Sequence, residues 1–216
     1  MKYKFITLIL LISATSSILF QSCKTTITEP ESIEIEKLMQ YCYENEIFNG
    51  AILVTKNRKP IYKKAFGFAD KNNNRMLNES SVFYLASVSK QFTTMAIMIL
   101  KEQNKLNYND NLSSYFPEFP DYADSVTIKH LMTHTSGIAD HYRLGIYKKG
   151  LTNRDVYELL TKQKHLDFTP GEKFSYSNGG YVLLSLIVEK VSGMPFHKFM
   201  EANIFKPLKM SNTLVY

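Results

Sequence analysis

The spacing of apolar positions along the chain begins with a helical pattern over residues 33–46. Apolar side chains recur there at positions 35, 38, 39 and 42, which is the spacing of one helix face. Two β-rich runs follow at 51–55 and 61–68, separated by the turn sequence KNRKP, and this arrangement predicts a β-hairpin. Residues 70–81 are almost entirely polar and predict a loop.

The rest of the chain has the pattern of helices and connecting loops. From Val88 to about Asn104 the apolar positions trace one helix face, with Ser87 at its N-terminal edge. Further helices are expected at residues 127–134, 152–164, 181–193 (closed by Gly193) and 194–208 (with Pro195 in its first turn). The order predicts an α+β fold. Because two strands are not stable as a sheet by themselves, we expect the partner strands of the hairpin to lie beyond Tyr216.

The N-terminus has the pattern of an export signal. Lysines at positions 2 and 4 precede an apolar run at 5–12 and a Ser/Thr-rich stretch, too short and too polar together to span a membrane. The sequence predicts a signal peptide over residues 1–22, a linker over 23–32 and one domain over 33–216. Cys23 is similar to a bacterial lipoprotein processing site, which predicts a lipidated N-terminus, a membrane anchor and a place in the cell envelope or periplasm.

Two details qualify this prediction. Phe20 and Gln21 differ from the residues usual before such a cysteine, so plain secretion is the alternative. With Cys23 lipidated, Cys42 has no partner for an intrachain disulfide, and its place in a helical pattern predicts a small core residue.

Composition and charge exclude several classes of function. The 216 residues are 44% hydrophobic and 21% charged, which fits one domain or a two-lobed unit and argues against disorder. The formal charge of +6 is spread along the chain without a basic helix or patch, so no nucleic-acid partner is expected. His130 and His134 are four residues apart but lack the glutamate of a zinc-protease helix, and Asp140 lies in a predicted loop, so no metal site is expected.

Ser87 and Lys90 form an S-x-x-K sequence at the predicted start of a helix. Residues three apart on a helix share a face, with Cβ atoms about 5–6 Å apart, so Lys90 can reach the Ser87 hydroxyl. A serine needs a base to take its proton, and lysine serves as a base only where its surroundings lower its pKa from about 10.4. The alternative is that both residues cap the helix, which is the commoner role of a lone S-x-x-K.

A second polar cluster, Tyr176-Ser177-Asn178, precedes a strongly apolar run. In one interpretation Ser177 or Asn178 is an N-cap, and Gly179-Gly180 permits close packing. In the other, the phenol shares or relays the serine proton, and the amide binds a substrate carbonyl or orients the lysine.

Four segments, in their order along the chain, resemble the serine β-lactamase-related family: ASVSKQFT, HLMTHTSGI, PGEKFSYSNGGYVLLSLIVEKVSG and IFKPLKMSNT. That family includes class C β-lactamases, low-molecular-weight D-alanyl-D-alanine carboxypeptidases and β-lactamase-like esterases. The resemblance covers residues 33–216. It implies a β-lactamase/transpeptidase-like α+β fold, in which an antiparallel sheet with flanking helices lies beside a helical lobe and the active site lies between them.

The resemblance also implies a role for each residue of the two clusters. Ser87 would be the acylated nucleophile, Lys90 its general base, Tyr176 the second proton-transfer residue and Asn178 the contact to a substrate amide. The Tyr-Ser-Asn form matches the class C and peptidase-esterase branch rather than class A enzymes, which carry Ser-Asp-Asn. The implied function is a serine acyl hydrolase acting on a β-lactam, a peptidoglycan peptide or a small ester, without a metal or organic cofactor.

The family's third motif, Lys-Thr-Gly or His-X-Gly on a later strand, has no counterpart after Asn178. The candidate Val191-Ser192-Gly193 lacks the cation. We therefore expect the domain to be incomplete at its C-terminus, with the missing strands and motif beyond Tyr216. Two alternatives to a hydrolase stay open: a non-catalytic penicillin- or peptidoglycan-binding or sensing module, and an inactive truncated remnant.

Overall fold

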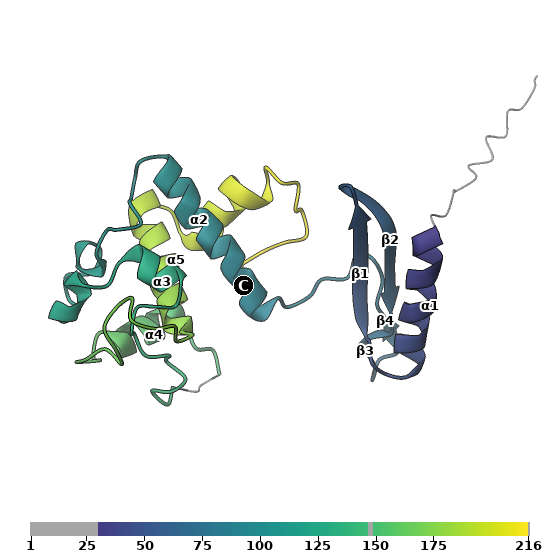
Figure 1. Ribbon diagram of the computed structural model, residues 1–216, viewed down its shortest axis with the longest axis horizontal. Helices are drawn as coiled ribbons and strands as arrows, with labels where there is room; N and C mark the ends of the chain where they lie inside the picture. The colour runs from purple at the N-terminus through teal and green to yellow at the C-terminus, as the bar shows by residue number, and fades with distance from the viewer. Residues whose placement is uncertain (1–29, 147–148, 216) are drawn as a thin grey trace, which may run out of the picture. The chain divides into compact units, whose positions relative to one another are not determined.

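The computed structural model describes residues 30–146 and 149–215, and these divide into two compact units, one on each side of the boundary between Ser81 and Val82 (Figure 1). The predicted signal peptide, Cys23 with its predicted lipid anchor, and most of the predicted linker lie outside the described residues. Within the described ranges, no helix is both long enough and apolar enough to cross a membrane.

The first unit contains the predicted helix and hairpin. Helix α1 (Pro30–Glu44) precedes strands β1 (Gly50–Lys56) and β2 (Lys59–Phe66), which pair antiparallel. The backbone φ angles of Asn57 and Arg58 are +51° and +63°, so these two residues form the turn, with the left-handed conformation that matches the twist of a hairpin. The prediction of a helix followed by a hairpin is confirmed, and the loop is shorter than predicted.

Helix α1 lies against β2 (Figure 1). One carboxylate and a pair of aromatic rings hold it there. Glu36 accepts hydrogen bonds from the Tyr62 hydroxyl at 2.7 Å and from the Lys64 ammonium at 2.5 Å. The rings of Tyr43 and Phe66 lie 5.8 Å apart. Cys42 is half-buried and free, so it lies at the edge of the core and not inside it as predicted.

One prediction for this unit is wrong. The run 61–68 is not a single strand, because Gly67 breaks it with a φ of +81°. A side chain at Gly67 would have its Cβ 2.0 Å from the Asn49 side-chain oxygen, which accepts the Phe68 N–H at 2.7 Å. Beyond this break, β3 (Phe68–Asp70) pairs with β4 (Arg75–Met76), a second small hairpin that begins at the end of the predicted strand and continues into the predicted loop.

The second unit is helical in its described part and contains the predicted helices with shifted ends. They are α2 (Lys90–Glu102), α3 (Ile128–Met132), α4 (Asn153–Leu160), α5 (Asn178–Ser192) and α6 (Phe196–Met200), the last continued by a π-helical turn, η4 (Glu201–Phe205). The same unit also contains three 3-10 turns, which are η1 (Ala86–Ser89), η2 (Leu112–Ser114) and η3 (Asp121–Asp124). Pro195 is the N-cap of α6 and not part of its first turn. From 149 to 215 the structure contains no strand, and strands beyond Tyr216 stay a prediction.

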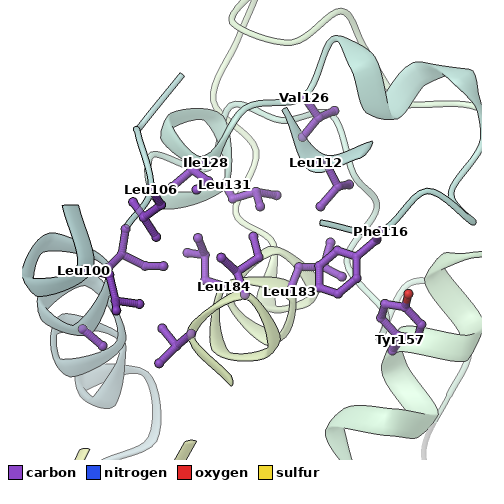
Figure 2. Packing of buried hydrophobic residues seen from close by; sticks show 14 of the residues in the cluster. Leu100, Leu106, Leu112, Phe116, Val126, Ile128, Leu131, Tyr157, Leu183 and Leu184 are labelled. Carbon is purple, nitrogen blue, oxygen red and sulfur yellow. The ribbon is translucent and has the colours of Figure 1, made fainter. Parts of the chain in front are cut away.

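Helix α5 is the centre of the core of this unit. Its apolar residues lie on more than one side, and it packs against α2, α3, α4 and α6. Figure 2 shows Leu183 and Leu184 of this helix among buried side chains from other parts of the unit. Leu183 and Leu184 are fully buried, with Leu100, Leu131 and Phe116 among the residues of the same cluster. The helix ends at Gly193, whose φ of +70° is the left-handed conformation that stops many helices. Helices in one unit and small antiparallel sheets in the other confirm the predicted α+β class.

Because Leu184 has no exposed surface, we expect Leu184→Ala to lower the free energy of unfolding by about 2–5 kcal/mol through lost burial and a cavity. Urea unfolding followed by circular dichroism measures the change. Leu208→Ala is the control, because Leu208 is 63% exposed, and its effect should stay within about 0.5 kcal/mol. Equal effects of the two substitutions would contradict the central place of α5 in the core.

Candidate active site

Ser87 and Lys90 are neighbours because a 3-10 turn joins them. Ser87 lies in η1, and Lys90 is the first residue of α2, so the helix begins later than the predicted Val88. A 3-10 helix has three residues per turn, which places side chains i and i+3 on the same side. The Lys90 ammonium donates a hydrogen bond to the Ser87 hydroxyl at 3.3 Å. The structure therefore brings the two predicted residues together.

The residue before Ser87 has an unusual backbone conformation. Ala86 has a φ of +46°, in the left-handed region that costs a residue with a Cβ about 1–2 kcal/mol. The Ser89 hydroxyl donates to the Ala86 carbonyl at 2.6 Å, which holds this turn. Such strain is often found where a functional side chain must be held in place. Sequence reasoning missed Ala86, since alanine gives no signal for a positive φ.

The Tyr176-Ser177-Asn178 cluster supports both interpretations made from the sequence, each for different residues. Ser177 has an extended backbone, so its two neighbours point to the side opposite its own side chain. Its hydroxyl caps α5 by accepting the Gly180 N–H at 3.2 Å. The Tyr176 hydroxyl donates to Ser87 Oγ at 2.6 Å, and Asn178 Oδ1 accepts from Lys90 Nζ at 2.8 Å. All four predicted site residues thus form one hydrogen-bonded group.

The Lys90 ammonium lies between two aromatic rings. Its nitrogen is 4.9 Å from the ring centre of Tyr176 and 5.5 Å from that of Tyr181. Burial raises the pKa of Tyr176, but hydrogen bonding with Lys90 and Ser87, together with the positive charge of Lys90, outweighs burial and leaves this pKa below its usual value of 10. A phenol with a lowered pKa gives up and takes back a proton more readily near neutral pH.

The imidazole ring of His134 packs against the ring of Tyr176. The two ring centres are 4.4 Å apart, and Nδ1 of His134 accepts the Ser177 N–H at 3.2 Å, which requires that nitrogen to be unprotonated. Burial lowers the pKa of His134, and the charge of Lys90 lowers it further. Burial lowers the pKa of His141, which is almost fully buried, and it outweighs the charge of Asp140, which raises this pKa; Lys90 lowers it slightly further. His130 has another role, since its Nδ1 accepts the Thr127 N–H at the start of α3.

His134 and His141 make the free energy of unfolding depend on pH. A folded-state pKa below the unfolded value of about 6.5 means that the unfolded chain binds protons first. Their contribution is therefore complete above about pH 6.5 and is lost as the pH falls toward the lowered folded-state pKa. Urea midpoints between about pH 7.5 and 5 should fall, and less steeply in His134→Gln and His141→Gln. His197→Gln, at an exposed position on α6, is the control and should leave the slope unchanged; equal slopes in all variants would contradict the prediction.

One further carboxylate contacts the hydrogen-bonded group of the four site residues, and it was not among the site residues predicted from the sequence. Asp140 is buried, and its Oδ2 accepts hydrogen bonds from the backbone N–H of Asn178 at 2.6 Å and from the side-chain amide of Asn178 at 2.9 Å. Its Oδ1 accepts the backbone N–H of Tyr142 at 2.9 Å. The contact to Asn178 joins residues 38 positions apart, and no local sequence pattern signals it.

The arrangement has the elements of covalent catalysis: a hydroxyl, a lysine and a phenol within hydrogen-bonding distance of that hydroxyl, and an amide on the lysine. No metal site was expected from the sequence, because the histidine pair lacks the glutamate of a zinc-protease helix. Among the residues that the structure describes, no group of three or more side chains is placed to hold a metal ion.

Comparison with known proteins extends this description. The family profile named Beta-lactamase matches residues 34–216. Penicillin-binding protein 4* of Bacillus subtilis (strain 168) is 37% identical over 189 residues, which cover 84% of this chain and 41% of the relative. Protein flp of Staphylococcus aureus (strain N315) is 31% identical over 196 residues, which cover 88% of this chain and 39% of the relative. The chain thus spans 39–41% of the length of these relatives.

Solved structures of related proteins are also similar to this chain. EstCE1, a hydrolase with promiscuous acyltransferase activity, matches with a TM-score of 0.73 and 28% identity over 84% of this chain and 53% of its own. A penicillin binding protein from Bacillus halodurans matches with a TM-score of 0.72 and 30% identity over 82% of this chain and 57% of its own.

Proposed function

Because the chain belongs to the beta-lactamase family, we propose that it is a serine acyl hydrolase that works through an acyl-enzyme on Ser87. The observation that carries this proposal is the position of the Ser87 hydroxyl, 2.6 Å from the Tyr176 hydroxyl and 3.3 Å from the Lys90 nitrogen. A serine becomes a nucleophile when a neighbouring group takes its proton, and two such groups lie within reach here.

The proposed reaction has two halves. In the first, Ser87 Oγ attacks the substrate carbonyl while Lys90 takes the hydroxyl proton. The bond from the carbonyl carbon to the leaving nitrogen or oxygen then breaks, and Tyr176 passes a proton to that leaving atom. In the second half, water attacks the acyl-enzyme and gives a proton to the Tyr176 phenolate. The bond to Ser87 Oγ then breaks, and Lys90 returns its proton to the serine. Asn178 would contact the substrate amide and hold Lys90.

The substrate class is proposed from the relatives and the chemistry. Two of the matched proteins are named as penicillin-binding and one as a hydrolase with acyltransferase activity. An amide or ester carbonyl is common to β-lactams, peptidoglycan stem peptides and small esters, and these are the candidates. We also propose that the protein is exported to the cell envelope and anchored through lipidated Cys23, from the pattern of residues 1–23.

Covalent labelling tests this proposal directly. The full-length gene product is incubated with a fluorophosphonate probe and, separately, with a fluorescent penicillin, and the modified residue is identified by mass spectrometry. We expect a single adduct on Ser87, together with turnover of a chromogenic cephalosporin, a D-alanyl-D-alanine peptide or a p-nitrophenyl ester. An adduct without turnover of any of these substrates would indicate a binding or sensing module, and no adduct with either probe would overturn the acyl-enzyme.

A further inference from the structure

The buried carboxylate behind the site has a restricted set of partners. Asp140 is 7% exposed, and burying a carboxylate is costly unless hydrogen bonds compensate it. Of the three hydrogen bonds of Asp140 described above, two come from one residue, Asn178, and they meet on a single oxygen, Oδ2. One of these two donors is the backbone N–H at the start of α5, which does not move when the side chain rotates. Asp140 is therefore anchored to the helix and holds the amide from a fixed point.

The chemistry of the two groups around Asn178 allows only one orientation of its amide. A carboxylate can only accept hydrogen bonds, and an ammonium can only donate them, whereas an amide has one end of each kind. With NH2 toward Asp140 and oxygen toward Lys90, both contacts are satisfied, at 2.9 Å and 2.8 Å. With the amide turned around, an oxygen would face the carboxylate and an NH2 would face the ammonium.

The orientation matters most when Lys90 is neutral and ready to act as a base. A neutral amine has a lone pair that can accept a proton, and it still has N–H groups that donate. If the Asn178 oxygen accepts one of these N–H groups, the lone pair is left for the Ser87 hydroxyl at 3.3 Å. If the NH2 faced the amine instead, it would occupy the lone pair, and Lys90 could not take the serine proton.

We propose that Asp140 is a positioning residue for acylation, because it keeps the Asn178 oxygen toward Lys90 and so leaves the lone pair of Lys90 for Ser87. This inference rests on the proposed function and adds a residue to it. Asp140 touches neither Ser87 nor the reacting atoms in the contacts described, and it acts through Asn178.

Kinetics of an isosteric variant test the proposal. In Asp140→Asn, one of the two carboxylate oxygens becomes an NH2 group. Either the two Asn178 donors or the Tyr142 N–H then loses its acceptor. We expect the acylation rate constant to fall by about 10- to 100-fold, the range for a hydrogen bond to a charged group, with KM changed by less than about 3-fold. The matched control is Asp110→Asn, since Asp110 accepts the Asn107 N–H and the Tyr115 hydroxyl at 2.7 Å each, elsewhere in the unit.

A double-mutant cycle separates positioning from general stability. If Asp140 acts through Asn178, Asp140→Asn should slow acylation by less than about 3-fold in an Asn178→Ala background, although it is damaging alone. A purely structural role predicts the same loss in both backgrounds, and that result would overturn the proposal. So would an Asp140→Asn enzyme that acylates as fast as Asp110→Asn.

A spectroscopic readout keeps the proposal independent of activity. In the wild-type protein, the side-chain amide protons of Asn178 should exchange with solvent at least about 10-fold more slowly than those of exposed Asn212, because they donate to a buried carboxylate. Asp140→Asn should remove most of this protection, while the amide of Asn153, which donates to Ser185, stays unchanged. Unprotected Asn178 protons in the wild type overturn the inference, even where Asp140→Asn fails to fold.

The two proposals can fail separately. A wild-type protein without an adduct on Ser87 refutes the acyl hydrolase, while protected Asn178 protons that Asp140→Asn releases still support the anchoring by Asp140. A Ser87 adduct with unprotected Asn178 protons supports the hydrolase and refutes the positioning.

Discussion

Replacing Ser87 by alanine is expected to lower the rate of acyl-substrate turnover by about 10⁴- to 10⁶-fold, to the level of the reaction without the acyl-enzyme. The substitution removes the only atom that can form the proposed covalent bond, and it leaves Lys90 and Tyr176 in place. Mass spectrometry should find no probe adduct, and kcat/KM should fall without a loss of stability, because Ser87 is exposed in a turn with no buried residues.

The control for Ser87 lies two residues away in the same turn. Ser89 donates to the Ala86 carbonyl at 2.6 Å and lies outside the hydrogen-bonded group of the four site residues. Ser89→Ala loses one hydrogen bond of about 0.5–1.5 kcal/mol, so its effect on turnover should stay within about 10-fold. Equal labelling of Ser87→Ala and the wild type would place the nucleophile elsewhere.

Replacing Lys90 by methionine is expected to slow acylation by about 10²- to 10⁴-fold, the usual contribution of a general base. Methionine keeps much of the apolar stem but cannot take the Ser87 proton. It also removes the hydrogen bond and the charge of Lys90, which both lower the pKa of Tyr176, so the second proton-transfer group is weakened as well. Stopped-flow measurement of the acylation step separates this effect from deacylation.

Lys101→Met is the matched control, because Lys101 lies in the last turn of the same helix and its side chain is directed toward Tyr108, with the ammonium 6.0 Å from that ring. It should leave the acylation rate unchanged. A Lys90→Met protein that acylates at the wild-type rate would exclude Lys90 as the base and leave Tyr176 as the candidate.

Local patterns in the sequence predicted the contacts that local geometry determines. Ser87 and Lys90 are three residues apart, so their proximity follows from any helical turn. The contact from Tyr176 to Ser87 joins residues 89 positions apart, and no periodicity predicts it; the resemblance to a family supplied it. Neither the local patterns nor the family resemblance identified Asp140 as a site residue. Its partner Asn178 is distant in the sequence, and a loop has no periodic pattern of apolar residues.

The helices were predicted more reliably than the small strands for a related reason. Helix α5 has a long apolar run, and its N-cap, Ser177, was one of the two candidates, although the apolar pattern itself begins only at Tyr181 because the first turn is polar and glycine-rich. Strand β4 has only two residues, both exposed, within a polar stretch. Burial and periodicity are the signals that sequence reasoning uses, and neither is present there.

The 3-10 turn that joins Ser87 to Lys90 makes the number of intervening residues more important than their identity. With three residues per turn, one inserted residue would rotate the lysine by about 120° around the axis, and one deletion would rotate it equally in the other sense. Val88 is exposed, so changes of its side chain are compatible with the arrangement, and a change of Ser89 removes only one hydrogen bond of the turn. A change in the length of this segment would instead separate nucleophile and base without altering either residue.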